Sequence, residues 1–372
     1  MTRVDYPRSE AELSCAAVPP SLPILAPPPR AARPSRSARA ADAAFSALPS
    51  DLAARGFKNP EHAFSQLQRP WLWQAGAPAL GRDNRALHSF SVAPPVICSR
   101  NAAADGSHKL LVEVDDGDRV EAVHMPRAGR VTLCISSQVG CAMGCTFCAT
   151  ATMGFGRHLG AHEIVGQVLA AVSALGPRHP GDITLVFMGM GEPLHNLPQV
   201  ARAIQVLCHP AGLGLSPRRI TVSTSGLVPE LDELGRVEPR PLLAISVNAT
   251  TDEQRAQLMP IGRRYPLAQL RSALERFPVR PRERITVEYV LLAGINDSPE
   301  DARRLANYCA TFPNQINLIP FNEHRATEFR SPSEDTVDAF ARAVLGERRT
   351  VLTVRRSRGR DVGAACGQLV LA

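Results

Sequence analysis

Lysine is nearly absent from this chain of 372 residues, where it occurs only as Lys58 and Lys109. The formal net charge is nevertheless +7 and the isoelectric point is about 9.1, so arginine carries almost all of the positive charge. Arginine binds phosphate through two parallel hydrogen bonds and also stacks on nucleobases. The charge balance therefore suits a polyanionic partner without identifying one.

The sequence also has no run of about twenty apolar residues, which is the length that a membrane-spanning helix requires. Its start, MTRVDYPRSE, lacks the apolar core of a secretory signal peptide. Nine cysteines could indicate disulfide bonds, but three of them stand in one short motif and the others are scattered. Because a metal site made of those three needs reduced thiols, we expect a cytoplasmic protein with no membrane partner.

The short motif is CAMGCTFC, which contains Cys141, Cys145 and Cys148. Three thiolates at this spacing can hold three irons of a 4Fe–4S cluster, because soft sulfur ligands suit iron–sulfur clusters. The fourth iron is then free to chelate the amino and carboxylate groups of S-adenosylmethionine (SAM). A structural zinc site is the alternative, but it wants four ligands and no second C-x-x-C pair lies nearby.

The first third of the sequence has a different character from the rest. Proline, alanine and arginine crowd residues 16–40 without periodicity, so we expect a disordered arm over residues 1–42. Residues 43–90 are predicted to form a small helical domain of two short helices. Residues 91–130 are predicted to form a β-rich connecting segment, because apolar runs there are separated by turn sequences.

From residue 131 to 372, strand-like and helix-like stretches alternate, which predicts a single α/β catalytic domain. The apolar strand-like runs are 131–136, 183–188, 219–224, 241–247, 284–292, 315–320 and 350–354. Alternation of this kind predicts parallel strands joined by right-handed crossovers. We therefore expect an open or partial barrel with its site at the carboxyl ends of the strands. The cysteine motif directly follows the first of these strands.

Polar or glycine residues recur at the ends of these strands. The second strand is followed by GMGEP, in which glycines permit close approach of the backbone to a ligand and Glu192 could bind an amino group. The other candidates at this edge are Gly191, Ser223, Ser246, Val247, Asn248 and Asn322. Each polar residue could equally cap a helix. Their recurrence at successive strand ends favours one shared pocket.

Two further cysteines could be reactive. Cys134 lies in the first strand, where it could equally be a small buried apolar residue. Cys366 lies in the small-residue segment GAACG, which would suit a thiol that moves between two reaction partners. Four arginines precede it, and positive charge favours a thiolate. These are Arg355, Arg356, Arg358 and Arg360. The spacing alone leaves a catalytic role for Cys366 open.

Several motifs occur together in one order: CAMGCTFCAT, MGFGR, GMGEP, STSG, LMPI, ITVEYVLLAGIND, INLIPFN and GRDVGAACGQL. In this combination the chain resembles the RlmN/Cfr family of radical-SAM RNA methyltransferases, which modify an adenine base. The resemblance runs from about residue 92 to 370. It departs at Asn248, where many members have histidine, and after Asn322, where EHRATEF replaces a proline- and glycine-rich loop. It implies a radical-SAM partial (β/α)6 barrel with a small N-terminal helical domain.

The resemblance also implies a reaction, methylation of carbon 2 of an adenine in 23S rRNA, tRNA or both. One SAM would methylate Cys366, and a second SAM, held by the cluster, would supply the radical that activates this methyl group. Glu121 would accept a proton, and Cys134 would form a transient disulfide with Cys366. The implied SAM contacts are Gly191, Glu192, Ser223, Ser246, Val247, Asn248 and Asn322. A monomer and an electron donor such as flavodoxin are expected.

Three alternatives stay open at this point. Methylation at carbon 8 is the Cfr outcome, although the N-terminal extension favours carbon 2. A radical-SAM enzyme acting on a protein or small molecule would have no need of the Cys134 and Cys366 pair. A non-catalytic RNA-binding protein with the same fold is the third alternative, against which the intact cluster cysteines argue.

Overall fold

The computed structural model describes residues 46–68, 96–175, 180–347 and 350–371, all of which belong to one compact unit, Arg33–Ala372. The predicted arm and the second half of the predicted helical domain lie outside the described residues. Within the described parts, no helix is long and apolar enough to cross a membrane.

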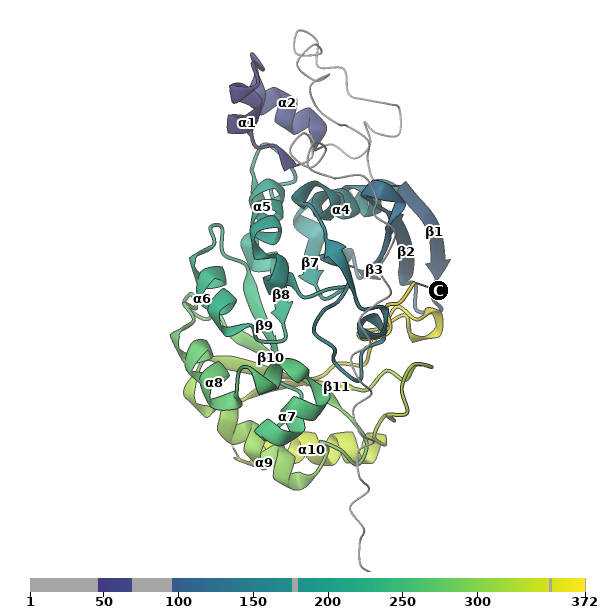
Figure 1. Cartoon of the computed structure of the whole chain (residues 1–372), viewed down its shortest axis with the longest axis vertical. Coiled ribbons are helices and arrows are strands. Elements are labelled where there is room, and N and C mark those ends of the chain that lie inside the picture. Colours follow the sequence, from purple (N-terminus) through teal and green to yellow (C-terminus); the bar gives the residue numbers. More distant parts are fainter. Residues whose placement is uncertain (1–45, 69–95, 176–179, 348–349, 372) are drawn as a thin grey trace, which may run out of the picture. The chain divides into compact units, whose positions relative to one another are not determined.

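A ten-stranded sheet forms the centre of the described structure, in the order β1-β2-β3-β4-β7-β8-β9-β10-β11-β12 (Figure 1). Its strands are β1 Val96–Ala102, β2 His108–Glu113, β3 Arg119–Arg127, β4 Arg130–Cys134, β7 Ile183–Phe187, β8 Ile220–Thr224, β9 Leu242–Ser246, β10 Ile285–Leu291, β11 Asn314–Pro320 and β12 Val351–Val354. Neighbours from β4 to β12 are parallel, and β1 to β4 are antiparallel. The predicted radical-SAM partial barrel is confirmed, and residues 96–127 extend the same sheet.

Helices connect the parallel strands and cover the outer side of the sheet, where α5, α6, α8, α9 and α10 follow one another in Figure 1. The helices are α1 Pro49–Ala54, α2 Pro60–Leu67, α4 Ala161–Leu175, α5 Leu197–Cys208, α6 Val228–Arg236, α7 Asp252–Leu258, α8 Leu267–Arg276, α9 Pro299–Tyr308 and α10 Glu334–Glu347. In α5 the buried residues Val200, Ala203, Ile204 and Leu207 recur at helical spacing. One apolar face of each such helix thus closes the core.

The two N-terminal helices, α1 and α2, lie within residues 43–90, for which two short helices were predicted, and they pack beside α5. The guanidinium of Arg202 on α5 donates to the carbonyl of Ser46 at 2.8 Å and also pairs with Asp51. The ring of Phe64 meets that of His209 edge-on, with centroids 4.7 Å apart. These contacts attach the helices to the outer layer, away from the cysteine motif.

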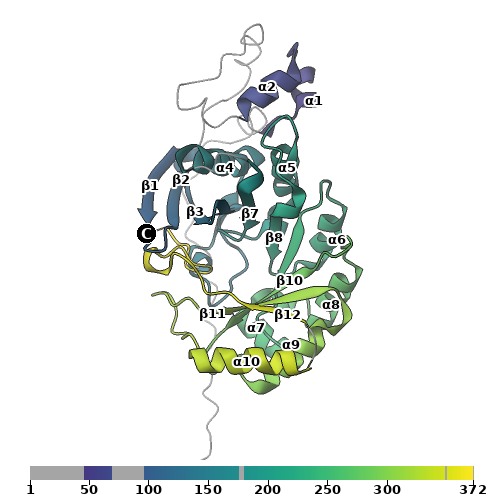
Figure 2. The ribbon, with the colours of Figure 1, turned by 180° about the vertical axis from the view of Figure 1, so that it is seen from behind.

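Two segments that lie outside the main sheet shape the site. A short hairpin, β5 Gln138–Gly140 and β6 Phe155–His158, encloses the cysteine loop. The segment after β12 returns to lie beside the β1–β3 strands (Figure 2). There the amide of Gly359 donates to Asp105 at 3.0 Å. The C-terminal segment therefore passes the carboxyl ends of the parallel strands.

Candidate active site

The three motif cysteines lie in the loop between β5 and β6 and line one cavity of about 170 Å³. The amide of Cys141 donates to the carbonyl of Gly154 at 2.8 Å, and that of Cys148 donates to the carbonyl of Cys145 at 3.1 Å. All three thiols are free. Burial raises the pKa of each, to about 12 for Cys141. A metal centre would have to displace their protons.

The spacing of these thiols tests which metal centre they fit. In the described part of the chain, the three sulfur atoms do not all lie within 4.8 Å of one another. A tetrahedral zinc ion with Zn–S bonds of about 2.3 Å needs sulfurs roughly 3.8 Å apart. The wider arrangement, with three cysteines on one cavity, suits a 4Fe–4S cluster better than a single zinc ion.

The GMGEP loop packs tightly against the end of β4, and its glycines make this possible. A Cβ on Gly189 would lie 2.6 Å from the carbonyl oxygen of Ile135. A Cβ on Gly191 would lie 2.8 Å from the backbone nitrogen of Gln138, and Gly191 has a φ of +101°. Both glycines line the cavity. The two glycines thus let the loop pack against the backbone of Ile135 and Gln138, and they also face the cavity.

Glu192 lines the cavity but its side chain is already engaged. Its carboxylate accepts hydrogen bonds from the amides of Leu194 at 3.0 Å and Ser225 at 2.7 Å. Burial raises the pKa of this carboxyl. The side chain therefore joins the GMGEP loop to the end of β8, while its backbone amide donates to the side chain of Gln138 at 2.8 Å and its carbonyl accepts from the amide of His195 at 3.1 Å.

Most of the other predicted SAM contacts meet at the same cavity. Its lining includes Ser223, Ser246, Asn248 and Asn322. The side-chain oxygen of Asn248 accepts from the amide of Val290 at 2.9 Å, and its φ of +55° is one that asparagine tolerates. Val247 is not in the lining; it is buried, and its carbonyl accepts from Arg255 at 2.7 Å.

Glu288 is a cavity residue that the sequence reasoning missed. It lies on β10 and is 6% exposed, and its carboxylate accepts from the hydroxyl of Ser223 at 2.9 Å. Its other oxygen lies 3.7 Å from the guanidinium of Arg355. The available signal was a single acidic residue inside the apolar run ITVEYVLL.

Cys366 lines this cavity and also a second, much smaller one of about 10 Å³. Cys134 and Arg355 line the smaller cavity with it. A space of this size holds about one water molecule, so the lining groups lie close together. Burial and, to a smaller extent, the nearby Cys366 raise the pKa of Cys134 to about 12. The structure thus brings the two predicted reactive cysteines together.

The C-terminal segment that carries Cys366 is held by hydrogen bonds from two loops. The Asn322 amide donates to the carbonyl of Cys366 at 3.0 Å. In the turn after the third motif cysteine, the amide of Ala149 donates to the carbonyl of Gly367 at 2.7 Å. The hydroxyl of Thr150 donates to the carbonyl of Leu369 at 2.6 Å. Cys366 is therefore fixed beside the cysteine loop.

Glu121 lies on β3, two residues before Val123, which pairs with Cys134 on β4. It is absent from the lining of both cavities described here and is 3% exposed. Lys109 forms an ion pair with it at 2.9 Å. Burial raises the pKa of Glu121, while the hydrogen bond and charge of Lys109 lower it. The predicted proton acceptor is thus close to the reactive cysteines but covered.

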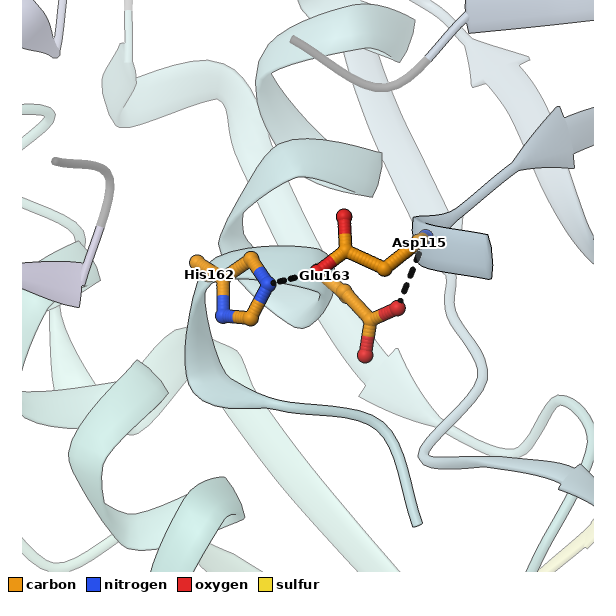
Figure 3. A group of neighbouring side chains, drawn as sticks. All are labelled: Asp115, His162 and Glu163. Atoms are coloured by element: carbon orange, nitrogen blue, oxygen red, sulfur yellow. Dashed lines mark hydrogen bonds and ion pairs between the residues drawn. The ribbon is translucent and has the colours of Figure 1, made fainter. Parts of the chain in front are cut away.

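A second polar group, Asp115, His162 and Glu163, lies between the β2–β3 turn and the start of α4 (Figure 3). His162 bonds Asp115 at 2.8 Å, and the amide of Asp115 donates to Glu163 at 2.9 Å. The guanidinium of Arg157 donates to both oxygens of Glu163, at 2.8 and 3.0 Å. Because Arg157 already supplies the positive charge, this group holds β6 and α4 together.

Comparison with known proteins agrees with the fold and the cysteine loop. Residues 135–306 match the Radical SAM superfamily. A crystal structure of a radical SAM methyltransferase from Sphaerobacter thermophilus is 35% identical, with a TM-score of 0.80, and covers 88% of this chain and 99% of that chain. The chain is therefore a radical-SAM enzyme of the methyltransferase class, which implies a 4Fe–4S cluster and SAM as cofactors.

Proteins of similar sequence identify the family to which the chain belongs within the radical-SAM methyltransferases. A protein of Geobacter sulfurreducens is 50% identical over 309 residues, which is 80% of this chain and 83% of the relative. One from Anaeromyxobacter sp. is 48% identical over 317 residues, which is 82% of this chain and 83% of the relative. Both carry the name dual-specificity RNA methyltransferase RlmN. The chain belongs to the RlmN family.

Proposed function

We propose that this protein methylates carbon 2 of an adenine in RNA and that Cys366 carries the methyl group. The observation that supports this proposal is the position of Cys366 between two cavities. One cavity contains the three cluster cysteines and the predicted SAM contacts, and the other contains Cys134. A carrier that receives a group at one place and releases it at another needs such a position.

The need for a carrier follows from the chemistry of the base. Carbon 2 of adenine is electron-poor, so it does not displace the methyl group of a sulfonium directly. The cluster, held by Cys141, Cys145 and Cys148, would supply the electron that cleaves SAM reductively. Covalent attachment through Cys366 then divides one difficult transfer into easier steps.

Each protein group has one task in this proposal. The sulfur of Cys366 first bonds to the methyl carbon of SAM while the bond from that carbon to the sulfonium sulfur breaks. Glu121 accepts the proton that leaves the ring carbon. The thiolate of Cys134 then bonds to the sulfur of Cys366 while the bond from that sulfur to the transferred carbon breaks, and the transferred carbon keeps the electron pair and takes up a proton. SAM is held by Gly191, Glu192, Ser223, Ser246, Asn248 and Asn322, which line the larger cavity. Val247 supports Ser246 and Asn248 from a buried position outside this lining.

An RNA substrate is supported by the name of the relatives and by the arginine-rich charge. The words "dual-specificity" in that name favour two kinds of RNA, for which we propose 23S rRNA and tRNA. A target adenine would have to leave its stack to reach the cavity. An electron donor such as flavodoxin, a monomeric state and a cytoplasmic location complete the proposal.

The test combines anaerobically reconstituted enzyme, a reductant, methyl-deuterated SAM and unmodified 23S rRNA or tRNA. Mass spectrometry of the digested nucleosides should find labelled 2-methyladenosine. Cys366→Ala should abolish this product while SAM is still cleaved to deoxyadenosine. Cys208→Ala is the matched control, because Cys208 is a partly buried thiol at the end of α5, and it should leave methylation unchanged.

Each other result has a definite meaning. Labelled 8-methyladenosine would show that the enzyme methylates carbon 8 of the adenine and not carbon 2. Methylated RNA from the Cys366→Ala enzyme would remove Cys366 from the mechanism. Cleavage of SAM with no methylated nucleoside from either RNA would show that the substrate is something else.

A further inference from the structure

Four arginines follow the last strand, β12, and three of them have side-chain contacts that differ, while Arg360 is exposed. Arg355 and Arg358 line the small cavity with Cys134 and Cys366. Arg358 is engaged elsewhere, because its guanidinium donates to the carbonyl of Pro126 and to Asp105. Arg356 pairs with Glu334 at 2.6 Å, and its side chain is 68% exposed. Of these three arginines, Arg355 is thus the one that shares the small cavity with the two thiols and is not bonded to Asp105 or Pro126.

Arg355 is held in place from two directions. Its backbone amide donates to the carbonyl of Leu318 on β11 at 2.7 Å, directly after β12 ends. Its guanidinium lies 3.7 Å from the carboxylate of Glu288, which is itself bonded to Ser223. The same guanidinium is 3.6 Å from the sulfur of Met188. These contacts fix a positive charge beside the small cavity.

We propose that Arg355 is a positioning residue for the transfer of the methyl group to Cys366, and that Glu288 holds Arg355 in this role. The guanidinium stabilises and orients the anionic sulfur of Cys366 at the boundary between the two cavities. This inference rests on the proposed function of Cys366 and assigns a residue to its first step.

The electrostatic relations agree with this placement. The charge of Cys366 is the largest cause that raises the pKa of Arg355, and Glu288 and Cys134 raise it further. Arg355 in turn lowers the pKa of Cys134, against the larger effect of burial. A thiolate in a nearly closed space is costly unless a cation offsets it.

The step itself is balanced without an oxidant. The thiol of Cys366 gives its proton to water, and the sulfur bonds to the methyl carbon of SAM. The bond from that carbon to the sulfonium sulfur breaks, and its electron pair stays on S-adenosylhomocysteine. Anion and sulfonium become two neutral thioethers, so Arg355 is needed before the transfer rather than after it.

Two opposing trends set how much the loss of the Arg355 guanidinium should slow reactions of the Cys366 sulfur. A neighbouring cation stabilises a partly buried thiolate by about 1.5–3 kcal/mol. A thiolate that is less stabilised is also more nucleophilic, which cancels about half of this effect. Loss of the guanidinium should therefore slow reactions of the Cys366 sulfur by roughly three- to tenfold.

The experiment compares Arg355→Gln, Arg355→Lys and the matched control Arg356→Gln. The first readout is the rate of methylation of Cys366 by methyl-deuterated SAM without RNA, followed by peptide mass spectrometry. The second is the rate at which iodoacetamide alkylates Cys366 at neutral pH in cluster-free protein. Thermal unfolding is recorded for every variant. Arg355→Gln should slow both rates three- to tenfold with an unchanged KM for SAM. Arg355→Lys should recover most of the loss, and Arg356→Gln should match the unsubstituted enzyme.

Equal rates in Arg355→Gln and the unsubstituted protein would overturn the proposal. So would a lysine variant as slow as the glutamine variant, because a cation would then not be the cause. A loss shared by Arg356→Gln would point to a general charge effect and also refute it. If unsubstituted enzyme puts no methyl on Cys366, the proposed function fails and the methyl-transfer role of Arg355 fails with it, whereas a change in the alkylation rates alone would still show that Arg355 activates the Cys366 sulfur.

Discussion

The ion pair of Lys109 and Glu121 shows how single residues define this site. Both side chains are largely buried, at 15% and 4% exposure, and they meet at 2.9 Å. Lys109 is one of only two lysines in the chain. A buried carboxyl without a cation would hold its proton and could not accept another. Lys109 therefore does for Glu121 what Arg157 does for the buried carboxylate of Glu163.

Replacing Lys109 should therefore change the pH dependence of methyl transfer to RNA. In Lys109→Met the pKa of Glu121 should rise by about one to three units, because a neighbouring positive charge is lost. The carboxylate, which is the form that accepts a proton, would then exist only at higher pH. The acid limb of the rate profile should move to higher pH by the same amount, while methylation of Cys366 keeps its rate.

Lys58→Met is the control for this prediction, since Lys58 is the other lysine and is exposed on the turn between α1 and α2. Its rate profile should coincide with that of the unsubstituted enzyme. An unshifted acid limb in Lys109→Met would show that Glu121 does not depend on Lys109 or is not the proton acceptor.

Residue motifs located the site more reliably than they described it. GMGEP was placed correctly at the cavity, but its glycines approach Ile135 and Gln138, and Glu192 bonds backbone amides. A motif gives the position of a group along the chain, and it cannot give the contacts made by that group across the fold. Glu288 was not assigned to the site for the same reason, and Arg355 was named only as one of four arginines that precede Cys366 in the sequence.

The C-terminal segment, residues 364–371, is the element on which the proposed reaction most depends. It has no strand or helix of its own beyond a turn, so contacts with other elements hold it. The hydroxyl of Thr150 reaches the carbonyl of Leu369 across 219 residues of sequence. Hydrogen bonds to its backbone, together with the buried side chains of Ala364, Ala365 and Leu369, hold this segment. Loss of one hydrogen bond should therefore loosen this segment without unfolding the sheet.

Removing one of these bonds should loosen the segment selectively. In Thr150→Val the carbonyl of Leu369 loses its donor, at a cost of about 1 kcal/mol. Amide hydrogen exchange within residues 364–371 should then become several times faster, as measured by mass spectrometry of peptides. Exchange in β7 to β11 should stay unchanged, because global stability is set by the buried sheet.

Thr152→Val is the matched control, since Thr152 lies in the same turn and its hydroxyl donates locally to the carbonyl of Ala149 at 2.7 Å. It should leave exchange in the C-terminal segment unchanged. Equal acceleration in both variants would mean that the turn as a whole, rather than the bond to Leu369, holds the segment.

At this scale the sequence predicted elements well and long-range attachments poorly. The strands from β4 to β12 were predicted because buried parallel strands produce apolar runs separated by helices. That β1 to β3 continue the same sheet had no local signal, because strand pairing joins residues distant in sequence. The hydrogen bond between Thr150 and Leu369 could not be predicted from the sequence for the same reason.

On the scale of the whole molecule, the distribution of charge limits what can bind. Many exposed arginines are neutralised by carboxylates on the same surface, as in the pairs Arg276–Asp232, Arg303–Glu300 and Arg236–Glu233. The net charge of +7 is what remains across the full sequence, and lysine supplies at most two of the 42 positive side chains. Attraction of RNA should therefore be an arginine property and should weaken with salt.

Chemical modification of the intact protein can test this charge argument. Acylation of amines can modify only Lys58, Lys109 and the chain's terminal amine. RNA affinity should therefore stay nearly unchanged, although modification of Lys109 should lower turnover. Phenylglyoxal, which reacts with arginine, should weaken binding strongly, and RNA bound beforehand should protect against it. With about four phosphates contacted, raising salt from about 50 to 200 mM should weaken binding by roughly fiftyfold. Binding that ignores salt, or that falls after amine acylation alone, would contradict an arginine-based RNA surface, and the recognition would then have to come from base stacking and hydrogen bonds within the cavity.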